Sequence, residues 1–214
     1  MKLEKSQDRP RPDVREAILE AARELFVELG YEDVSLRKVA NKIGYSATTI
    51  YLHFADKESL FRELCGQDFG RLAAAFQQLV TIPDPRERLV ACGRAYIEFA
   101  VAHPKHYRLM FMTEVSAPAV QEAIECNPNP DENAYLFLRV LVEECMRAGA
   151  FRSDLTDVDL IAQTLWAAVH GVAALQITAC RDNSIPWRDF PMRCEALLDS
   201  ITHGMMRRLE RTEN

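Results

Sequence analysis

The sequence predicts an all-α protein, and three observations support that prediction. Apolar residues recur at helical spacing along most of the chain, as in the segment from Val14 to Leu29. No segment alternates apolar and polar residues between turn signals, which is the pattern of a half-buried strand. Prolines are absent between Pro12 and Pro83 and then recur at intervals, where each is expected to mark a helix boundary.

The composition fits one small and one larger domain. The chain has 214 residues, 48% of them hydrophobic and 27% charged, which is enough for a sizeable core. We expect a flexible arm over 1–12, a small domain over 13–62 and a larger domain over 63–214. The first residues lack the apolar stretch of a secretion signal, so a cytoplasmic location is expected. The six cysteines show no zinc-site spacing, and neither a metal nor another cofactor is predicted.

The first three helices are predicted from their caps and stops. A helix over 13–29 carries an apolar stripe and stops at Gly30. Ser35 is a good N-cap for a second helix, and Gly44 is the natural left-handed residue at its end. Ser46 then caps a third, short helix. Two short helices joined by a glycine turn form a helix-turn-helix, which predicts binding to duplex DNA.

The third helix has one apolar face and one polar face. Ile50 and Phe54 lie four residues apart and are expected to anchor it to the core. The residues left for the major groove are Ser46, Ala47, Thr48, Thr49, Tyr51 and His53. The available phosphate donors are Arg37, Lys38, Lys42, His53 and Lys57. Tyr51 and His53 have an alternative interpretation as rim residues that cover the helix ends.

The charge distribution favours one small DNA-binding surface. The whole chain has a net charge of −6, yet residues 36–57 hold four basic residues against one acidic residue. Residues 1–62 are balanced, so the rest of the chain carries the entire negative charge. Because an acidic surface is repelled by phosphates, only the helix-turn-helix region is expected to contact DNA. Lys57 begins the next helix, where the helix dipole disfavours a cation, and a bound phosphate would compensate for that cost.

The segment from Val14 to Cys65 resembles the N-terminal domain of TetR-family transcriptional regulators. The resemblance rests on the long first helix, on Gly30-Tyr31, on the Ser35-capped helix with Gly44, and on the runs TIYLHF at 49–54 and DKESL at 56–60. It implies a homodimer that binds a double-stranded operator. It also implies that the DNA-facing residues are Ser46, Ala47, Thr48, Thr49 and Tyr51, with Ser35 and Lys57 on phosphates.

The rest of the chain is predicted to be helical as well. A long helix over 57–80, about 35 Å at 1.5 Å per residue, leads out of the small domain. Further helices are predicted over 85–102, 104–112, 118–125, 132–148, 157–181 and 188–210. Residues 160–180 contain no charged residue and are long enough for a membrane span, but their polar side chains favour a helix buried in protein on most of its circumference.

Two segments of the larger domain resemble the C-terminal domain of a TetR subgroup recognised by a Trp, His, Gly signature. They are Tyr107 to Phe111, which follows His103-Pro104, and Trp166 to Gly171. The resemblance implies a ligand-sensing and dimerising module. Trp166 and His170 lie one helical turn apart on one face, where they either line a pocket or belong to a satisfied core.

The candidate ligand pocket is predicted to be aromatic and aliphatic. Its candidate residues are Tyr96, Phe99, His103, Tyr107, Met110, Phe111, Cys145, Trp166 and His170. Each has the alternative of plain core packing. Few of them carry charge, so a small, mostly apolar effector is expected. A metal site at His103 and His106 with a nearby cysteine is the disfavoured alternative, because Pro104 interrupts the helix between the histidines.

The last two helices are the expected dimer interface, as half of a four-helix bundle. Small residues for close approach are Ala167, Ala168, Gly171, Ala173 and Ala174, and apolar area comes from Leu197, Leu198, Ile201, Met205 and Leu209. A twofold dimer predicts a near-palindromic operator.

The function predicted from these features is a ligand-responsive transcriptional regulator, a repressor by the resemblance, in which an effector tilts the 57–80 helix. A helical regulatory scaffold that does not bind DNA is the alternative. An enzyme is not expected, because the sequence has no catalytic constellation and no phosphate-binding glycine loop.

Overall fold

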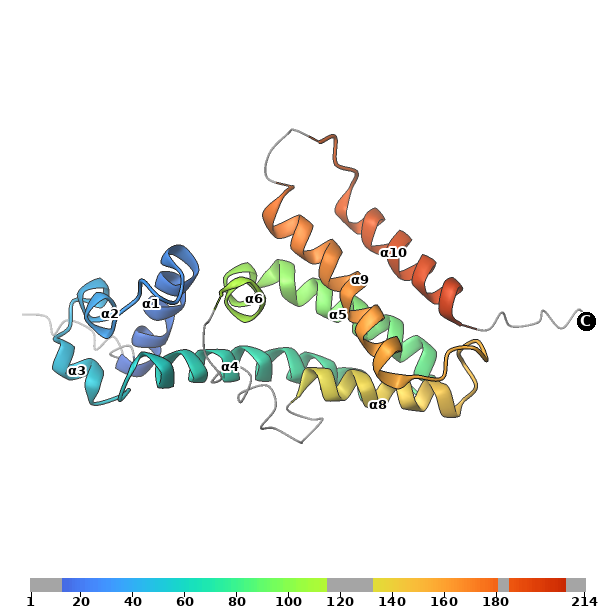
Figure 1. Cartoon of the computed structure of the whole chain (residues 1–214), viewed down its shortest axis with the longest axis horizontal. Coiled ribbons are helices and arrows are strands. Elements are labelled where there is room, and N and C mark those ends of the chain that lie inside the picture. The colour runs from blue at the N-terminus through green and yellow to red at the C-terminus, as the bar shows by residue number, and fades with distance from the viewer. Residues whose placement is uncertain (1–12, 115–132, 181–184, 207–214) are drawn as a thin grey trace, which may run out of the picture.

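The computed structural model describes residues 13–114, 133–180 and 185–206, and these residues are almost entirely helical (Figure 1). The helices are α1 Val14–Leu29, α2 Leu36–Ile43, α3 Ala47–Tyr51, α4 Lys57–Gln77, η1 Gln78–Thr81, α5 Pro85–Ala102, α6 Pro104–Met112, α8 Ala134–Arg147, α9 Val158–Thr178 and α10 Phe190–Met205. In the described ranges the only β-type pairing is an isolated bridge between Phe151 and Met206. The all-α prediction is confirmed. The expected arm over 1–12 and helix over 118–125 lie outside the described residues.

The helix ends follow from local cap chemistry. The Ser35 hydroxyl accepts a hydrogen bond from the backbone N–H of Lys38 at 3.2 Å, and that of Ser46 accepts from Thr49 at 3.2 Å. Gly44 has φ 72° and ψ 27°, the left-handed conformation that a glycine adopts without a Cβ clash. The predicted start and stop of α2 and the predicted start of α3 are therefore confirmed. Phe54, expected on the third helix, lies beyond the end of α3 at Tyr51.

The small domain has its own hydrophobic core. Phe26 of α1, Tyr31 and Phe61 of α4 form an aromatic cluster with ring centroids 4.9 to 5.7 Å apart. Ile50 of α3 is fully buried against the same core. Leu109 of α6 also packs into this core, although α6 belongs to the second half of the chain. The two domains are therefore packed directly against each other.

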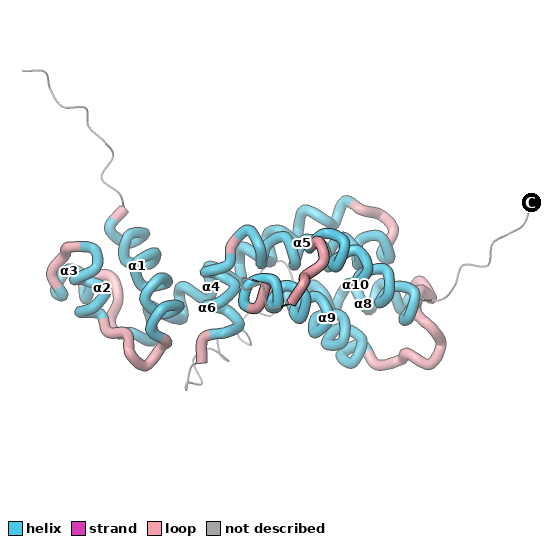
Figure 2. Tube along the Cα trace, turned by 90° about the horizontal axis from the view of Figure 1, so that it is seen from above, coloured by secondary structure: helices cyan, strands magenta, loops and turns pink. Residues whose placement is uncertain are grey.

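The larger core lies between α4, α5, α8, α9 and α10, and α5 packs against each of the other four and against α6. α4 contributes to both cores, since its first half packs with α1 and its second half with α5 and α8. In both views α1 to α3 lie at one end of an elongated molecule and α8 to α10 at the other (Figures 1 and 2). A displacement of α4 or α6 would therefore change the position of the small domain.

α9 is long and apolar enough to cross a membrane by length and composition alone. Within this chain it packs against α5, α8 and α10. The expectation that it is buried on most of its circumference is wrong, because one face stays at the surface, where Leu160 is 57% exposed and Leu175 45%. Among the described residues, this face is the part of α9 that α5, α8 and α10 leave uncovered.

Candidate functional site

α3 stands at the surface on an anchored base. Ile50 and Phe54 are buried at 0% and 3% exposure, whereas Tyr51 is 55% exposed and Leu52 81%. The predicted DNA-facing residues fall into two groups: Ser46, Thr48, Tyr51 and His53 are exposed, and Ala47 and Thr49 are half-buried. The face that a groove would receive is thus accessible. Contact with DNA by these residues stays a prediction.

The cations near α3 differ in how far the protein already uses them. Arg37 is exposed and makes no ion pair or hydrogen bond within the described part of the chain. Lys42 pairs with Glu24 at 3.1 Å, and Lys38 donates its ammonium to the carbonyl of Asp33 at 2.6 Å. Lys105 contacts Glu24 as well, and this ammonium, followed by that of Lys42, lowers the pKa of the Glu24 carboxyl. Arg37 is therefore the cation most available to a phosphate.

Lys57 has partners that the sequence did not reveal. Its ammonium donates to the backbone carbonyls of Tyr31 at 2.9 Å and Glu32 at 3.3 Å. It also lies 4.2 Å from the centroid of the Tyr31 ring. These contacts compensate for a cation in the first turn of α4, so a phosphate is not needed to explain this lysine. Its expected role as a phosphate contact stays a prediction.

Two exposed residues of this surface were missed by the sequence reasoning. Tyr45, 42% exposed, directly precedes the cap of α3, and Leu52 follows the end of α3. The exposure of Tyr45 could have been predicted from its position between the left-handed Gly44 and the capping Ser46, because a residue in a tight turn between two helices lies at the surface.

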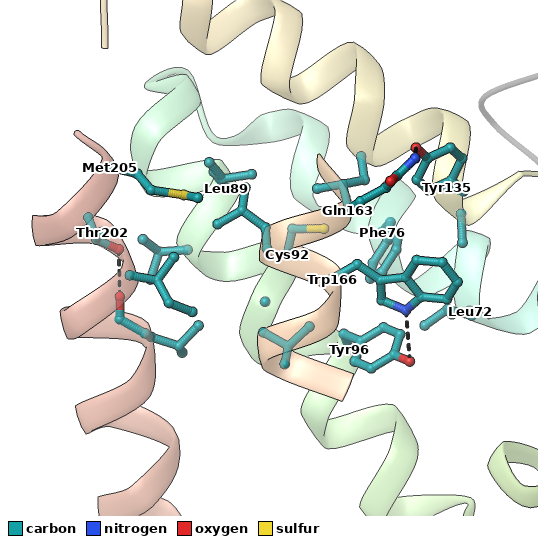
Figure 3. Close-up of a pocket in the computed structure, with 18 of the residues that line it drawn as sticks. Leu72, Phe76, Leu89, Cys92, Tyr96, Tyr135, Gln163, Trp166, Thr202 and Met205 are labelled. Carbon is teal, nitrogen blue, oxygen red and sulfur yellow. Dashed lines mark hydrogen bonds between the residues drawn. The ribbon is translucent and has the colours of Figure 1, made fainter. Parts of the chain in front are cut away.

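A cavity of about 390 Å³ lies in the larger domain between α4, α5, α8, α9 and α10 (Figure 3). Its aromatic walls include Phe76, Tyr135 and Trp166, and its aliphatic walls include Leu89 and Met205. Such a size and lining suit a small organic ligand. Of the predicted pocket residues, the cavity is lined by Tyr96, Phe111 and Trp166.

The remaining predicted pocket residues do not line this cavity. Phe99 and Met110 are buried in the helix packing, and the ring of His103 lies against Phe99 with centroids 5.2 Å apart. Cys145 is fully buried, and its thiol donates to the carbonyl of Pro85 at 3.2 Å. Helical spacing alone does not tell the core side of a helix from its cavity side, which is why the sequence grouped these residues with the cavity wall. Their role in effector binding stays a prediction.

Tyr107 and His170 lie behind the cavity wall in a buried hydrogen-bond network. The Trp166 indole donates to the Tyr96 hydroxyl at 3.1 Å, and that hydroxyl is 3.0 Å from His170 Nδ1. The Tyr107 hydroxyl is 2.7 Å from the same nitrogen. Burial raises the pKa of Tyr96 to about 12 and lowers the pKa of His170 below its ordinary value, so the network is uncharged near neutral pH. It joins the cavity wall to α6.

α6 is joined to the small domain by a buried charge cluster. Asp68 of α4 is 0% exposed and accepts from Arg23 of α1 at 3.1 Å and 3.3 Å. His106 of α6 lies 2.7 Å from the same carboxylate. The sequence does contain a signal for this cluster, because the apolar stripes of α1 and α4 each include one charged residue. Arg23 follows Leu19 by one turn on α1, and Asp68 lies one turn from both Leu64 and Leu72 on α4.

No group of three or more His, Cys, Asp or Glu side chains is arranged to hold a metal ion in the described ranges. The imidazoles of His103 and His106 have centroids 5.4 Å apart, but Asp68 and Arg71 are the partners of His106. Burial raises the pKa of the thiols of Cys92 and Cys145 to about 12, which keeps them protonated.

Comparison with known proteins matches one segment in each domain of the chain to a known family. Residues 18–64 match the family model described as bacterial regulatory proteins, tetR family, and residues 89–182 match that of the tetracyclin repressor-like C-terminal domain. The transcriptional activator FasR of Mycolicibacterium smegmatis is 31% identical over 118 residues, 54% of each chain. The transcriptional repressor KstR2 of Mycobacterium tuberculosis is 28% identical over 160 residues, 72% of this chain and 79% of that protein.

A solved structure supports the same fold. The fatty acid degradation regulator FadR from Bacillus halodurans superposes with a TM-score of 0.72 at 20% identity, covering 92% of this chain and 98% of that one. The match to FasR spans about half of that protein, and several other curated relatives are matched over less of their length. FasR is an activator and KstR2 a repressor, so relatives of this chain regulate in both directions.

Proposed function

We propose, from the premise that this chain belongs to the TetR family, that it is a DNA-binding transcriptional regulator controlled by a small, mostly apolar effector. The observation that carries the proposal is the exposure of α3 on an anchored base, with Tyr51 accessible while Ile50 is buried. A recognition helix that enters a major groove needs this arrangement. The finer proposal is a repressor that leaves its operator when the effector binds.

We further propose a homodimer through α9, with α10 in a secondary role. One stripe of α9 carries small, apolar or hydroxyl side chains without a charge. Its exposed members are Leu160, Thr164, Ala167, Leu175 and Thr178, and its half-buried members are Gly171 and Ala174. A surface of this kind allows two helices to approach closely and is typical of a subunit interface. A twofold dimer would place two α3 helices about one DNA turn, roughly 34 Å, apart or at a multiple of it, on a near-palindromic operator.

The expected contribution of α10 to this interface is smaller than its sequence indicated. Leu198, Ile201 and Met205 line the cavity of their own chain, and Ala173 of α9 is fully buried. Leu209 lies outside the described residues. The apolar side of α10 is used to close the cavity, so removing α10 would open the cavity as well as disturb a dimer, and single surface substitutions test the interface better.

Two relatives support an apolar effector. One of known structure is the ketosteroid transcriptional regulator KstR2 of Mycobacterium tuberculosis, and another is the fatty acid degradation regulator FadR of Bacillus halodurans. The apolar lining of the cavity agrees with a ligand of that general polarity. Coupling to DNA would run from the cavity wall through Tyr107 to α6, and from His106 through Asp68 to α1. We also propose a cytoplasmic location, where both DNA and the effector are accessible.

Selection of bound sites from a random duplex pool tests the proposed function directly. We expect a near-palindromic consensus, and an affinity that falls steeply with salt because phosphate contacts release counterions. The competing function, a helical scaffold that does not bind DNA, predicts no enriched site and no salt-dependent binding. That result would overturn the proposal.

A further inference from the structure

The cavity of the larger domain is polar at one end only. At the end formed by α8 and α9, the side chains of Tyr135 and Gln163 border it. At the α10 end the walls are apolar apart from Thr202, whose hydroxyl donates to the carbonyl of Leu198 at 2.7 Å. Figure 3 shows this asymmetry, with Thr202 and Met205 on one side and Tyr135 and Gln163 on the other. A ligand that fits must therefore have two unlike ends.

Two amides border the polar end, Asn133 and Gln163. Asn133 is committed to its own helix, because its Oδ1 caps α8 by accepting from the backbone N–H groups of Tyr135 and Leu136 at 3.1 Å. The Tyr96 hydroxyl is engaged with Trp166 in the buried network. The Tyr135 hydroxyl donates to Asp159 at 3.1 Å and accepts from Gln163 Nε2 at 3.3 Å. Gln163 keeps its second N–H and its carbonyl oxygen, because no other hydrogen bond of its side chain is found among the described residues. One donor and one acceptor are thus offered to a ligand, as a hydroxyl, ketone or ester group requires.

The described lining of the cavity carries no charge. None of the described lining residues is Asp, Glu, Lys, Arg or His. Asp159 lies beyond the Tyr135 hydroxyl, and it is already paired with Arg139 at 2.8 Å. An ionised carboxylate or ammonium would lose water on entry and gain no counter-charge, which is strongly unfavourable.

We propose that the cavity binds an uncharged amphiphile, with its hydrogen-bonding group at Gln163 and its hydrocarbon body directed between α5 and α9 toward α10. This inference deepens the effector part of the proposed function and rests on it. It excludes free fatty acids, acyl thioesters with charged carriers and quaternary amines as the preferred ligand class. It admits alcohols, ketones and esters with a linear or ring-shaped hydrocarbon body.

Matched pairs of probes test the charge requirement. Titration of the full-length protein at pH 8, followed by calorimetry and by the fluorescence of Trp166, compares dodecan-1-ol with dodecanoate and 2-naphthylmethanol with 2-naphthoate. In at least one pair the alcohol should bind with a dissociation constant at least about ten-fold below that of the anion, because an unpaired charge costs more than this factor. A preference for the alcohol below about ten-fold in both pairs, or no binding of any probe, overturns the inference.

Substitutions at Gln163 test the position of the polar group. Gln163→Leu should weaken dodecan-1-ol about five-fold or more by removing its hydrogen-bond partner. Gln67→Leu, the same change on α4 outside the cavity lining, should leave this affinity unchanged. Gln163→Lys supplies the missing counter-charge and should raise the affinity for dodecanoate about ten-fold. Equal effects of the two leucine variants, or no gain for dodecanoate, contradict the assignment.

Failure of this inference can be told apart from failure of the proposed function. Operator binding by the ligand-free protein does not depend on which probe the cavity accepts. If operator DNA is bound but every neutral probe fails, the regulator stands and the ligand class is wrong. If no operator is found while the neutral probes bind, the cavity assignment stands and the regulatory function is wrong.

Discussion

His106 and Tyr107 are consecutive residues of α6 that bond in opposite directions. The imidazole of His106 lies 2.7 Å from the buried carboxylate of Asp68, which also holds Arg23 of the small domain. The hydroxyl of Tyr107 lies 2.7 Å from the imidazole of His170, in the network behind the cavity wall. A single turn of helix thus joins the cavity to the small domain, and a ligand that shifts this turn would act on both.

The Asp68 carboxylate is expected to be essential to the stability of this joint. Asp68→Asn leaves Arg23, which is 3% exposed, with the solvent-exposed Glu20 as its remaining counter-charge, so we expect a loss of about 3 kcal/mol in the free energy of unfolding. Urea denaturation measures it. Asp154→Asn is the matched control, because Asp154 pairs with Arg152 at the surface and little change is expected. Equal effects of the two substitutions would show that the buried cluster is not a special site.

The hydroxyl of Tyr107 is expected to transmit the effector signal. Tyr107→Phe keeps the ring and its stacking on His170 but removes the hydrogen bonds of the hydroxyl to His170, so α6 should follow movement of the cavity wall less closely. Operator affinity measured with and without dodecan-1-ol gives the coupling free energy, which should fall below half of the wild-type value. Binding of dodecan-1-ol itself, measured by calorimetry, should change by less than about three-fold. Unchanged coupling would exclude this route.

Contacts with DNA should depend on Tyr51 and Arg37, two exposed residues whose side chains make no hydrogen bond or ion pair among the described residues. Tyr51→Ala should weaken operator binding by about 1 to 3 kcal/mol if the phenol contacts a base edge. Arg37→Ala should weaken all duplexes alike and lower the salt slope by about one. Fluorescence anisotropy over a salt series measures both. Arg147→Ala, an exposed arginine at the far end of α8, should behave as wild type.

The proposed dimer should depend on the small-residue face of α9. Gly171→Arg places a long charged side chain where two helices would approach closely, so a monomer is expected in sedimentation or light scattering. Val101→Arg changes another exposed apolar residue, on α5, and should leave the oligomeric state unchanged. A dimeric Gly171→Arg protein with normal operator binding would refute this interface.

Features set by local chemistry were predictable from the sequence. Ser35, Gly44 and Ser46 determine the ends of α2 and α3 through bonds within a few residues, and the structure has them as predicted. The anchoring of α3 by Ile50 and Phe54 follows equally from helical spacing. These signals act over one or two turns, so they do not depend on how the domains pack.

Features that depend on packing between distant helices were not predictable. Trp166 and His170 share a helix face, yet Trp166 lines the cavity while His170 faces Tyr107 of α6 behind it. From its helix alone, Leu198 is predicted to be an interface residue, but in the structure it packs closely against Gly93 of α5. A Cβ atom at position 93 would lie 2.7 Å from Leu198, so this packing depends on the absence of a side chain about one hundred residues earlier in the chain.

The buried imidazole of His170 should make the protein less stable in mild acid. Burial lowers its pKa below the ordinary value of 6.5, so near and below that pH the unfolded chain binds a proton that the folded chain does not. The contribution of His170 to the free energy of unfolding should therefore be constant above about pH 7. It should fall toward pH 5.5, by at most about 1.4 kcal/mol per pH unit.

His170→Asn should reduce the difference in stability between pH 7.5 and pH 5.5, measured by urea denaturation. It should not abolish that difference, because burial also lowers the pKa of His103. His203→Asn, at an exposed histidine of α10, should keep the wild-type difference, and a His170→Asn protein that also keeps it would show that the network admits the charged imidazole.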